Sequence, residues 1–308
     1  MEGHVYHIPV LLTPSVDGLN IKSSGVYVDV TLGGGGHSRE ILRRLGPDGR
    51  LISMDQDADA IAGIVNDEAL QDCRWTLIHS NFRYLRNWMR YYGIERIDGL
   101  LADLGVSSHH FDEGDRGFSF RTDAPLDMRM NQQARQTAAD VVNCYSSAQL
   151  TSLFRLYGEL RQGHRLADAI VKARQRQEIH TTGELQAVLT PMLSPASQKK
   201  DLARAFQALR IEVNHEMDAL REMLTTASEL LNPGGRLVVM SYHSLEDRMV
   251  KNLMRAGNIE GDIPQDVYGR TRAPLRPIGK PQTPSVEEQQ SNPRSRSAVL
   301  RIGEKVDD

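Results

Sequence analysis

The chain has 308 residues, more than one domain usually holds, so we expect either one large domain with an insertion or two domains. Its composition, 40% hydrophobic and 25% charged, is near the globular norm, and no apolar run approaches the roughly 20 residues that span a bilayer. Cys73 and Cys144 are too few for a disulfide framework or a thiolate metal site. The first nine residues lack the pattern of an export signal. These features predict a cytoplasmic protein without a membrane segment.

Short apolar runs alternate with helical patterns in the first third of the chain, which is typical of a parallel sheet flanked by helices. The expected strands cover residues 25–29, 50–55, 75–78 and 97–103, and a helix over 38–45 follows the first of them. The second and fourth strands each end on a carboxylate. Because ligands of such sheets bind at the carboxyl ends of the strands, these two acids are candidates for a binding site.

From about residue 115, helical periodicity replaces the alternation of strands and helices. Apolar residues recur at helical spacing over 150–157 and 166–173, and the sequence Thr-Thr-Gly-Glu at 181–184 is typical of a capping box. One long amphipathic helix is expected through residues 202–224. A helical module therefore interrupts the α/β pattern.

The α/β pattern returns near the C-terminus. An Asn-Pro-Gly-Gly turn at 232–235 is expected to stop the long helix before a strand over 236–240. The Pro-rich, polar stretch 257–293 predicts a loop or a partly disordered connector, and a last short strand is expected over 298–302.

Four consecutive glycines at 33–36 join the first strand to the helix after it. Such a turn lets the backbone approach a nucleoside cofactor closely, and free N–H groups at the helix start face the ligand. A plain reversal of the chain is the alternative. A dinucleotide fingerprint is incomplete, because Ser38 takes the place of its third glycine, and a Walker lysine is absent.

Two carboxylates carry the rest of the chemistry. Asp55 lies about 20 residues beyond the glycines, where a carboxylate accepts both hydroxyls of a ribose, in a dehydrogenase or a methyltransferase alike. Asp103 ends the fourth strand beside the same cleft, where it or nearby carbonyl groups could hold the amine that accepts a methyl group. A surface aspartate and a loop-ordering aspartate are the plain alternatives. Histidines and carboxylates do not occur at metal-ligand spacing, so we expect no metal.

Aromatic and basic residues point to nucleic acid. Phe118, Phe120 or Tyr242 could stack on an extruded base, with core packing an equal alternative. Tyr242 and His243 follow a strand into the same cleft. Between residues 268 and 303 the chain has seven basic residues against two acidic ones, and the helical module carries more. Such clusters could neutralise RNA phosphates, although a charge run is usually only a solvated face.

Together these segments resemble one family closely, the bacterial ribosomal small-subunit RNA cytosine-N4 methyltransferases, known as RsmH or MraW. The resemblance spans nearly the whole chain. The matching segments are residues 7–10, 29–38, 55–57, 81–82, 98–108, 116–120, 125–130, 157–159, 206–211, 213–214, 243–248 and 292–297.

The resemblance implies a class I, Rossmann-like α/β methyltransferase fold with an inserted all-helical domain. The expected domains are a first methyltransferase part over 1–114, a helical substrate-recognition domain over 115–213, and a second methyltransferase part with a basic tail over 214–308. The implied reaction is N4-methylation of a cytosine in the decoding centre of 16S rRNA, with S-adenosyl-L-methionine as the donor. We expect the small ribosomal subunit to assemble before it is methylated.

The glycine turn and the resemblance together give the expected donor-binding residues: Gly33, Gly34, Gly35, Gly36, His37, Asp55, Phe82, Asp103 and His110. The family generally has glutamine at the position of His110, and both side chains donate or accept a hydrogen bond. Asp103 is also the candidate catalytic residue. The residues expected to face RNA are Phe118, Arg129, Tyr242, His243, Arg294 and Arg296.

Three alternatives share parts of this pattern. A nicotinamide-dependent oxidoreductase would share the turn and Asp55, but the missing third glycine counts against it. A non-catalytic RNA-binding assembly factor would keep the basic clusters without needing a methyl donor. A methyltransferase of the same fold acting on DNA, protein or a small molecule is the nearest rival, because a fold alone does not fix the substrate.

Overall fold

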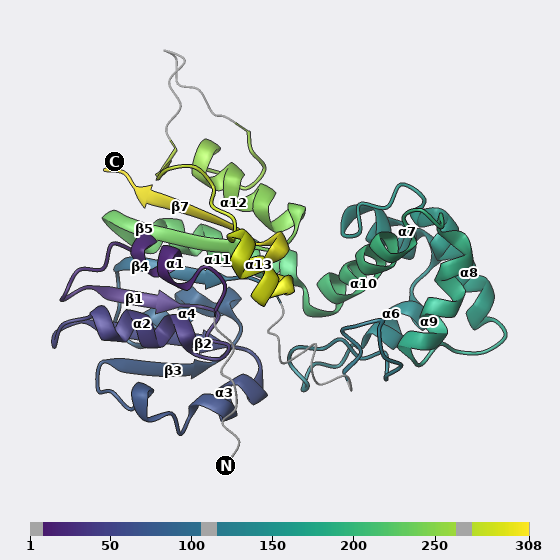
Figure 1. Ribbon diagram of the computed structural model, residues 1–308, viewed down its shortest axis with the longest axis horizontal. Helices are drawn as coiled ribbons and strands as arrows, with labels where there is room; N and C mark the ends of the chain where they lie inside the picture. Colours follow the sequence, from purple (N-terminus) through teal and green to yellow (C-terminus); the bar gives the residue numbers. More distant parts are fainter. Residues whose placement is uncertain (1–8, 106–115, 263–272, 308) are drawn as a thin grey trace. The chain divides into compact units, whose positions relative to one another are not determined.

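The computed structural model describes residues 9–105, 116–262 and 273–307 (Figure 1). The chain divides into two compact units. Unit 1 contains residues 9–105, 217–262 and 273–307, and unit 2 contains residues 116–216. Within the described residues, no helix is long and apolar enough to cross a membrane.

Unit 1 is built on a seven-stranded sheet with the strand order β3-β2-β1-β4-β5-β7-β6 (Figure 1). Strands β1 to β5 are parallel, and β7 runs antiparallel to both β5 and β6. This arrangement confirms the predicted Rossmann-like α/β fold of class I methyltransferases. The strands are β1 (Val26–Asp29), β2 (Arg50–Asp55), β3 (Trp75–His79), β4 (Ile97–Asp103), β5 (Leu231–Ser241), β6 (Leu275–Pro277) and β7 (Val299–Lys305).

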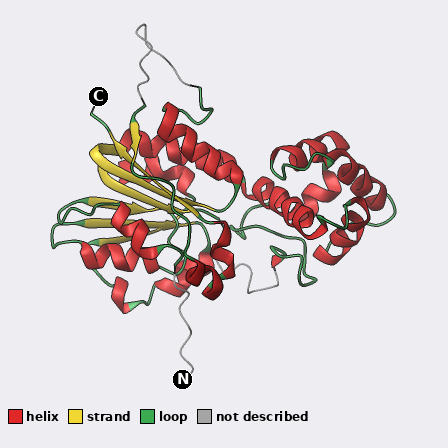
Figure 2. Cartoon of the chain, turned by 45° about the horizontal axis from the view of Figure 1, so that its top comes forward, coloured by secondary structure: helices red, strands yellow, loops and turns green. Residues whose placement is uncertain are grey.

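Helices cover both faces of this sheet (Figure 2). Because side chains alternate along a strand, Tyr27 faces a core formed with α1 and α2, and its neighbour Val28 faces a core formed with α4, α11 and α12. The helices of this unit, with the short 3₁₀ turns, are α1 (Leu12–Gly18), α2 (Gly36–Arg44), α3 (Ala58–Ile64), η1 (Glu68–Leu70), η2 (Phe82–Tyr84), α4 (Leu85–Tyr91), α11 (Glu216–Leu230), α12 (Ser244–Ala256), α13 (Val286–Ser291) and η5 (Pro293–Ser297).

The C-terminal part of unit 1 corrects two expectations. Strand β5 begins at Leu231 instead of residue 236, because Leu231 already pairs with Ile97 before the chain bulges and pairing resumes between Arg236 and Gly99. The stretch expected to be a connector contains β6, which pairs with β7, and helix α13.

The regular elements of unit 2 are helices, besides one isolated β-bridge between Pro125 and Thr181, and its apolar side chains form one core of their own. Its elements are α6 (Ala138–Cys144), α7 (Ser147–Leu156), α8 (Gly163–Arg174), α9 (Thr182–Leu189), η4 (Thr190–Met192) and α10 (Gln198–Asn214). The predicted capping box is confirmed, since the side chains of Thr181 and Glu184 each accept the other's backbone N–H at the start of α9.

The expected single helix over 202–224 is wrong, because the chain forms two helices that break at His215. His215 has a left-handed backbone with φ 49°, which ends α10. The Asn214 side chain accepts the N–H of Met130 and donates to the carbonyl of Met128. Contacts made at the end of the helix, which periodicity does not reveal, accompany this break.

Candidate active site

The carboxyl ends of the five parallel strands meet at one edge of the sheet in unit 1. The glycine turn follows β1, and Asp55 and Asp103 are the last residues of β2 and β4. Phe82 follows β3, and Tyr242 follows β5 directly. Binding residues of open α/β sheets gather at this edge, so the fold brings these predicted site residues together.

The glycine turn presents an open backbone. Gly33 and Gly35 have φ angles of 49° and 73°, which favour glycine, and the Gly35 N–H donates to the Leu32 carbonyl at 2.8 Å. Gly34 is exposed, and a Cβ atom placed on it would meet nothing within 4 Å. The turn is therefore open at Gly34, where the absence of a side chain permits close approach of a ligand to the backbone.

Gly36, by contrast, lies under the N-terminal segment of the described chain. A Cβ atom on Gly36 would lie 2.1 Å from Cγ of Pro9. Two residues on, the Leu11 N–H donates to Oε1 of Glu288 in α13 at 2.7 Å. Pro9 therefore packs on the first residue of α2, and a hydrogen bond to α13 holds the segment that follows it.

We expect Gly36→Ala to lower the melting temperature of the ligand-free protein by roughly 2 to 10 °C, because the new methyl group overpacks against Pro9. Gly34→Ala is the matched control, since its Cβ points into open space. Thermal unfolding followed by circular dichroism measures both. Equal melting temperatures for the two variants would contradict this packing.

Asp55 ties the turn to the end of β2. Its Oδ2 accepts the N–H of Gly33 and its Oδ1 accepts the N–H of Asp57, both at 2.9 Å. A carboxylate can accept hydrogen bonds from ligand hydroxyls as well as from backbone N–H groups. Asp55 can thus hold a ribose and the turn together.

A chain of buried hydrogen bonds supports the turn from below. Asp29 is fully buried and accepts from the Ser38 hydroxyl at 2.7 Å, which lies 2.8 Å from the Ser53 hydroxyl. Asp29 also accepts the Thr31 N–H, and the Thr31 hydroxyl accepts the Asp103 N–H at 2.6 Å. Burial raises the pKa of Asp29 to about 6, against the opposing bond from Ser38. The network joins the two strand ends that carry Asp29 and Asp103.

Asp103 is the titratable group at the centre of the site. Its Oδ1 accepts the Tyr242 hydroxyl at 2.8 Å, and its Oδ2 lies 3.9 Å from Nδ1 of His37. Burial raises the pKa of Asp103 to about 7; the Tyr242 bond lowers it, and the nearby charges of Asp29 and Glu246 raise it further. A carboxyl group with such a pKa can accept a proton near neutral pH.

His37 is a buried, neutral donor or acceptor beside Asp103. Its side chain is only 5% exposed, and burial lowers its pKa to about 4. Its Nε2 atom has no hydrogen-bond partner among the described residues. An unsatisfied polar atom at this depth is uncommon and suits a bound polar ligand.

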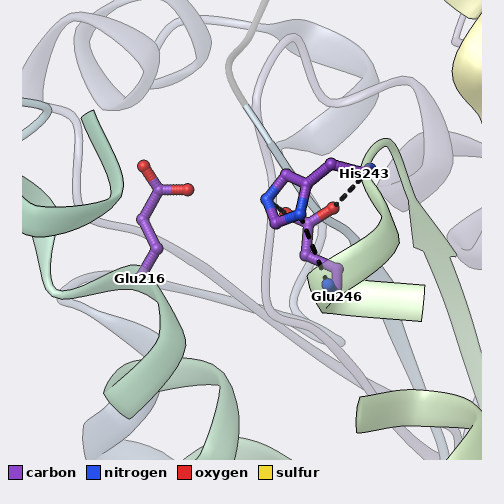
Figure 3. A group of neighbouring side chains, drawn as sticks. All are labelled: Glu216, His243 and Glu246. Carbon is purple, nitrogen blue, oxygen red and sulfur yellow. Dashed lines mark hydrogen bonds and ion pairs between the residues drawn. The ribbon is translucent and has the colours of Figure 1, made fainter. Parts of the chain in front are cut away.

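His243 and Glu246 form the cap of α12 (Figure 3). Nδ1 of His243 accepts the Glu246 N–H, while Oε2 of Glu246 accepts the N–H groups of Tyr242 and His243. The third residue drawn, Glu216 of unit 2, accepts two hydrogen bonds from Arg210, both at 2.9 Å. Each of these side chains thus has a structural role in its own unit, and we propose no metal there.

The residues expected to face RNA fall into two groups. In unit 2, Phe118 is buried in the helical core with the Arg116 guanidinium over its ring, and Arg129 binds Asp127 and the Ala134 carbonyl. The interpretation of Phe118 as core packing fits this burial, and the contact of Arg129 with RNA stays a prediction.

In unit 1, Arg296 is exposed in η5, just before β7 starts opposite the carboxyl end of β5. His110 and the side chain of Arg294 lie outside the described residues.

Sequence reasoning missed Thr31, Ser38 and Glu246 as supports of the site. Glu246 follows His243 at the spacing of a capping box, so this spacing could have found it. Thr31 and Ser38 flank the glycines, but only the strand pairing shows which strand ends they join.

Comparison with known proteins gives consistent results. The model of a family described as the MraW methylase family matches residues 4–306. A protein of Bacteroides thetaiotaomicron named ribosomal RNA small subunit methyltransferase H is 58% identical, covering 97% of each chain. Proteins of the same name from Bacteroides fragilis and Porphyromonas gingivalis are 57% and 53% identical and cover 99% and 98% of this chain, and 99% and 97% of their own.

Similarity to solved structures is weaker. An rRNA methylase from Streptococcus thermophilus aligns with a TM-score of 0.42 and 14% identity over 98% of this chain and 99% of its own. Similarity at this level is not informative about function. The match of the family model over nearly the full length, together with relatives above 50% identity, shows that the chain belongs to the MraW methylase family.

Proposed function

We propose that this protein transfers a methyl group from S-adenosyl-L-methionine to N4 of a cytosine in the decoding centre of 16S rRNA. The observation that carries the proposal is the meeting of the glycine turn, Asp55 and Asp103 at one edge of the sheet. The relatives named as small-subunit rRNA methyltransferases support the substrate class. The cytosine N4 position rests on the family resemblance of the sequence motifs.

The residues at the edge of the sheet fit an adenosine-containing methyl donor. The exposed backbone at Gly34 permits close approach, and the Asp55 carboxylate, which binds the Gly33 N–H, is a chemically suitable acceptor for ribose hydroxyls. The unpartnered Nε2 of His37 and the carboxyl group of Asp103 offer polar contacts, and Phe82 lies after the neighbouring strand. When bound, S-adenosyl-L-methionine supplies a methyl group activated by its positively charged sulfur.

Asp103 is the residue that acts on the amine that accepts the methyl group. An exocyclic amine that gains a methyl group loses one proton, and a carboxylate that accepts its hydrogen bond both orients the nitrogen and takes that proton. The Oδ2 atom makes no hydrogen bond within the described part of the chain, so it is available for this contact. Asp103 therefore acts as positioning acceptor and proton acceptor.

Contact with RNA draws on exposed basic residues, which each unit carries. Arg296 is exposed next to the start of β7, at the same edge of the sheet as Asp103. In unit 2, Arg165 and Lys172 are exposed on α8. Such cations bind phosphates without reading sequence, so they position RNA and leave base selection to the pocket.

Transfer of labelled methyl from S-adenosyl-L-methionine tests the substrate. Small subunits from a strain lacking this gene are expected to become labelled in 16S rRNA, faster than naked 16S rRNA, because subunit proteins shape the decoding centre. Large subunits serve as the control. Donor binding without label in any rRNA would overturn the proposal, and equal rates on naked RNA would remove the requirement for assembly.

A further inference from the structure

We propose that Tyr242 is a positioning residue for Asp103: its hydroxyl group holds Oδ1 and leaves Oδ2 as the atom that meets the acceptor amine. The inference rests on the proposed function, because it assigns a role within the same site. Tyr242 contacts the carboxyl group of Asp103, and this role does not require a contact between Tyr242 and the methyl donor.

Two hydrogen bonds fix Asp103, and its Oδ2 atom makes none within the described residues. The Thr31 hydroxyl accepts its backbone N–H at 2.6 Å, the Tyr242 hydroxyl donates to Oδ1 at 2.8 Å, and Oδ2 faces Nδ1 of His37 at 3.9 Å. Tyr242 is itself anchored, since its N–H donates to Oε2 of Glu246 at 2.8 Å. The two oxygens of Asp103 are therefore distinguished before any ligand binds.

The hydroxyl of Tyr242 acts as a donor at any pH at which the enzyme works. Burial, followed by the charge of Asp103, raises the pKa of Tyr242 above its ordinary value, so the phenol keeps its proton. A donated hydrogen bond stabilises the charged form of Asp103 and lowers its pKa, which favours the proton-accepting state. One hydrogen bond, from Tyr242 to Asp103, thus acts on both the position and the protonation state of the Asp103 carboxyl group.

Titratable groups on several elements lie around Asp103 and Tyr242. Asp29 at the end of β1 and Glu246 in α12 raise its pKa, and His37 in α2 stays neutral because burial lowers its own pKa to about 4. Glu288 of α13 acts on Tyr242 by its charge. Tyr242 therefore opposes two acids whose charges favour the protonated carboxyl group.

The test compares pH profiles of kcat/KM for methyl transfer. Tyr242→Phe keeps the ring and removes the donor, so the acidic limb is expected to move up by about one pH unit, the shift that one hydrogen bond to a charged group supports. Glu246→Gln keeps an acceptor for the cap of α12 and removes a negative charge. The acidic limb of its pH profile is therefore expected to move to lower pH. Tyr91→Phe, at a residue 76% exposed, is the control expected to leave the limb in place.

A second readout needs no turnover. Carbon-13 NMR follows the signal of the Asp103 carboxyl carbon, which is assigned because this signal disappears in Asp103→Asn. Its titration midpoint is expected about one pH unit higher in ligand-free Tyr242→Phe than in the wild type. An unchanged titration in Tyr242→Phe, with Asp103→Asn inactive, would overturn the role of Tyr242 alone. Full activity of Asp103→Asn would instead overturn the proposed role of Asp103 itself.

Discussion

Replacing Asp103 with asparagine is expected to lower kcat at saturating S-adenosyl-L-methionine by about 10²- to 10⁴-fold, the range that general acid–base groups contribute. The amide keeps the shape of the side chain and an oxygen that accepts the Tyr242 hydroxyl, but it cannot take a proton. Single-turnover transfer to small subunits measures the loss without interference from product release.

The fold of the Asp103→Asn variant is expected to survive. The folded protein raises the pKa of Asp103 to about 7, so this group favours folding most below its ordinary pKa of 3.8, and that contribution is lost as the pH rises through 7. The neutral amide is not subject to this loss, so the variant should unfold at pH 8 no more easily than the wild type. Asp103→Ala should be equally inactive but less stable, because it leaves the Tyr242 hydroxyl without an acceptor. A folded asparagine variant with near-normal kcat would show that Asp103 takes no proton.

Asp55→Ala is expected to raise the Kd for S-adenosyl-L-methionine by about 10²- to 10³-fold, because charge-assisted hydrogen bonds to ribose hydroxyls are lost together. The same change removes the acceptor of the Gly33 N–H, so the glycine turn loses its tie to β2. Isothermal titration calorimetry with the donor measures the effect.

Asp48→Asn is the matched control for Asp55, since Asp48 is exposed and lies before the opposite, amino-terminal end of β2. Its Kd should equal that of the wild type. An Asp55→Ala protein that binds the donor within a few-fold of the wild type would place the ribose elsewhere.

The sequence predicted what depends on short-range patterns. Strands β2 and β4 were expected with the bounds that the structure has, because apolar runs ending on a polar residue mark both ends. The turn after β1 was also predictable, because four consecutive glycines follow an apolar run. Since parallel strands end at a common edge, the meeting of Asp55 and Asp103 followed from the strands alone.

What depends on contacts between distant residues was not predictable. The Tyr242–Asp103 hydrogen bond joins residues far apart in the chain, and no local pattern marks it. The break at His215 interrupts a continuous apolar periodicity, so periodicity alone predicts one helix. Phe118 lies among polar residues in sequence yet is buried, because its environment comes from helices later in the chain.

The most direct test of the account is mass spectrometry of the nucleosides from small subunits methylated by this protein in vitro. We expect one new product, N4-methylcytidine, in 16S rRNA fragments from the decoding centre, and its absence when Asp103→Asn replaces the wild type. Methylation on another base, on carbon 5 of cytosine, or only outside the decoding centre would contradict it.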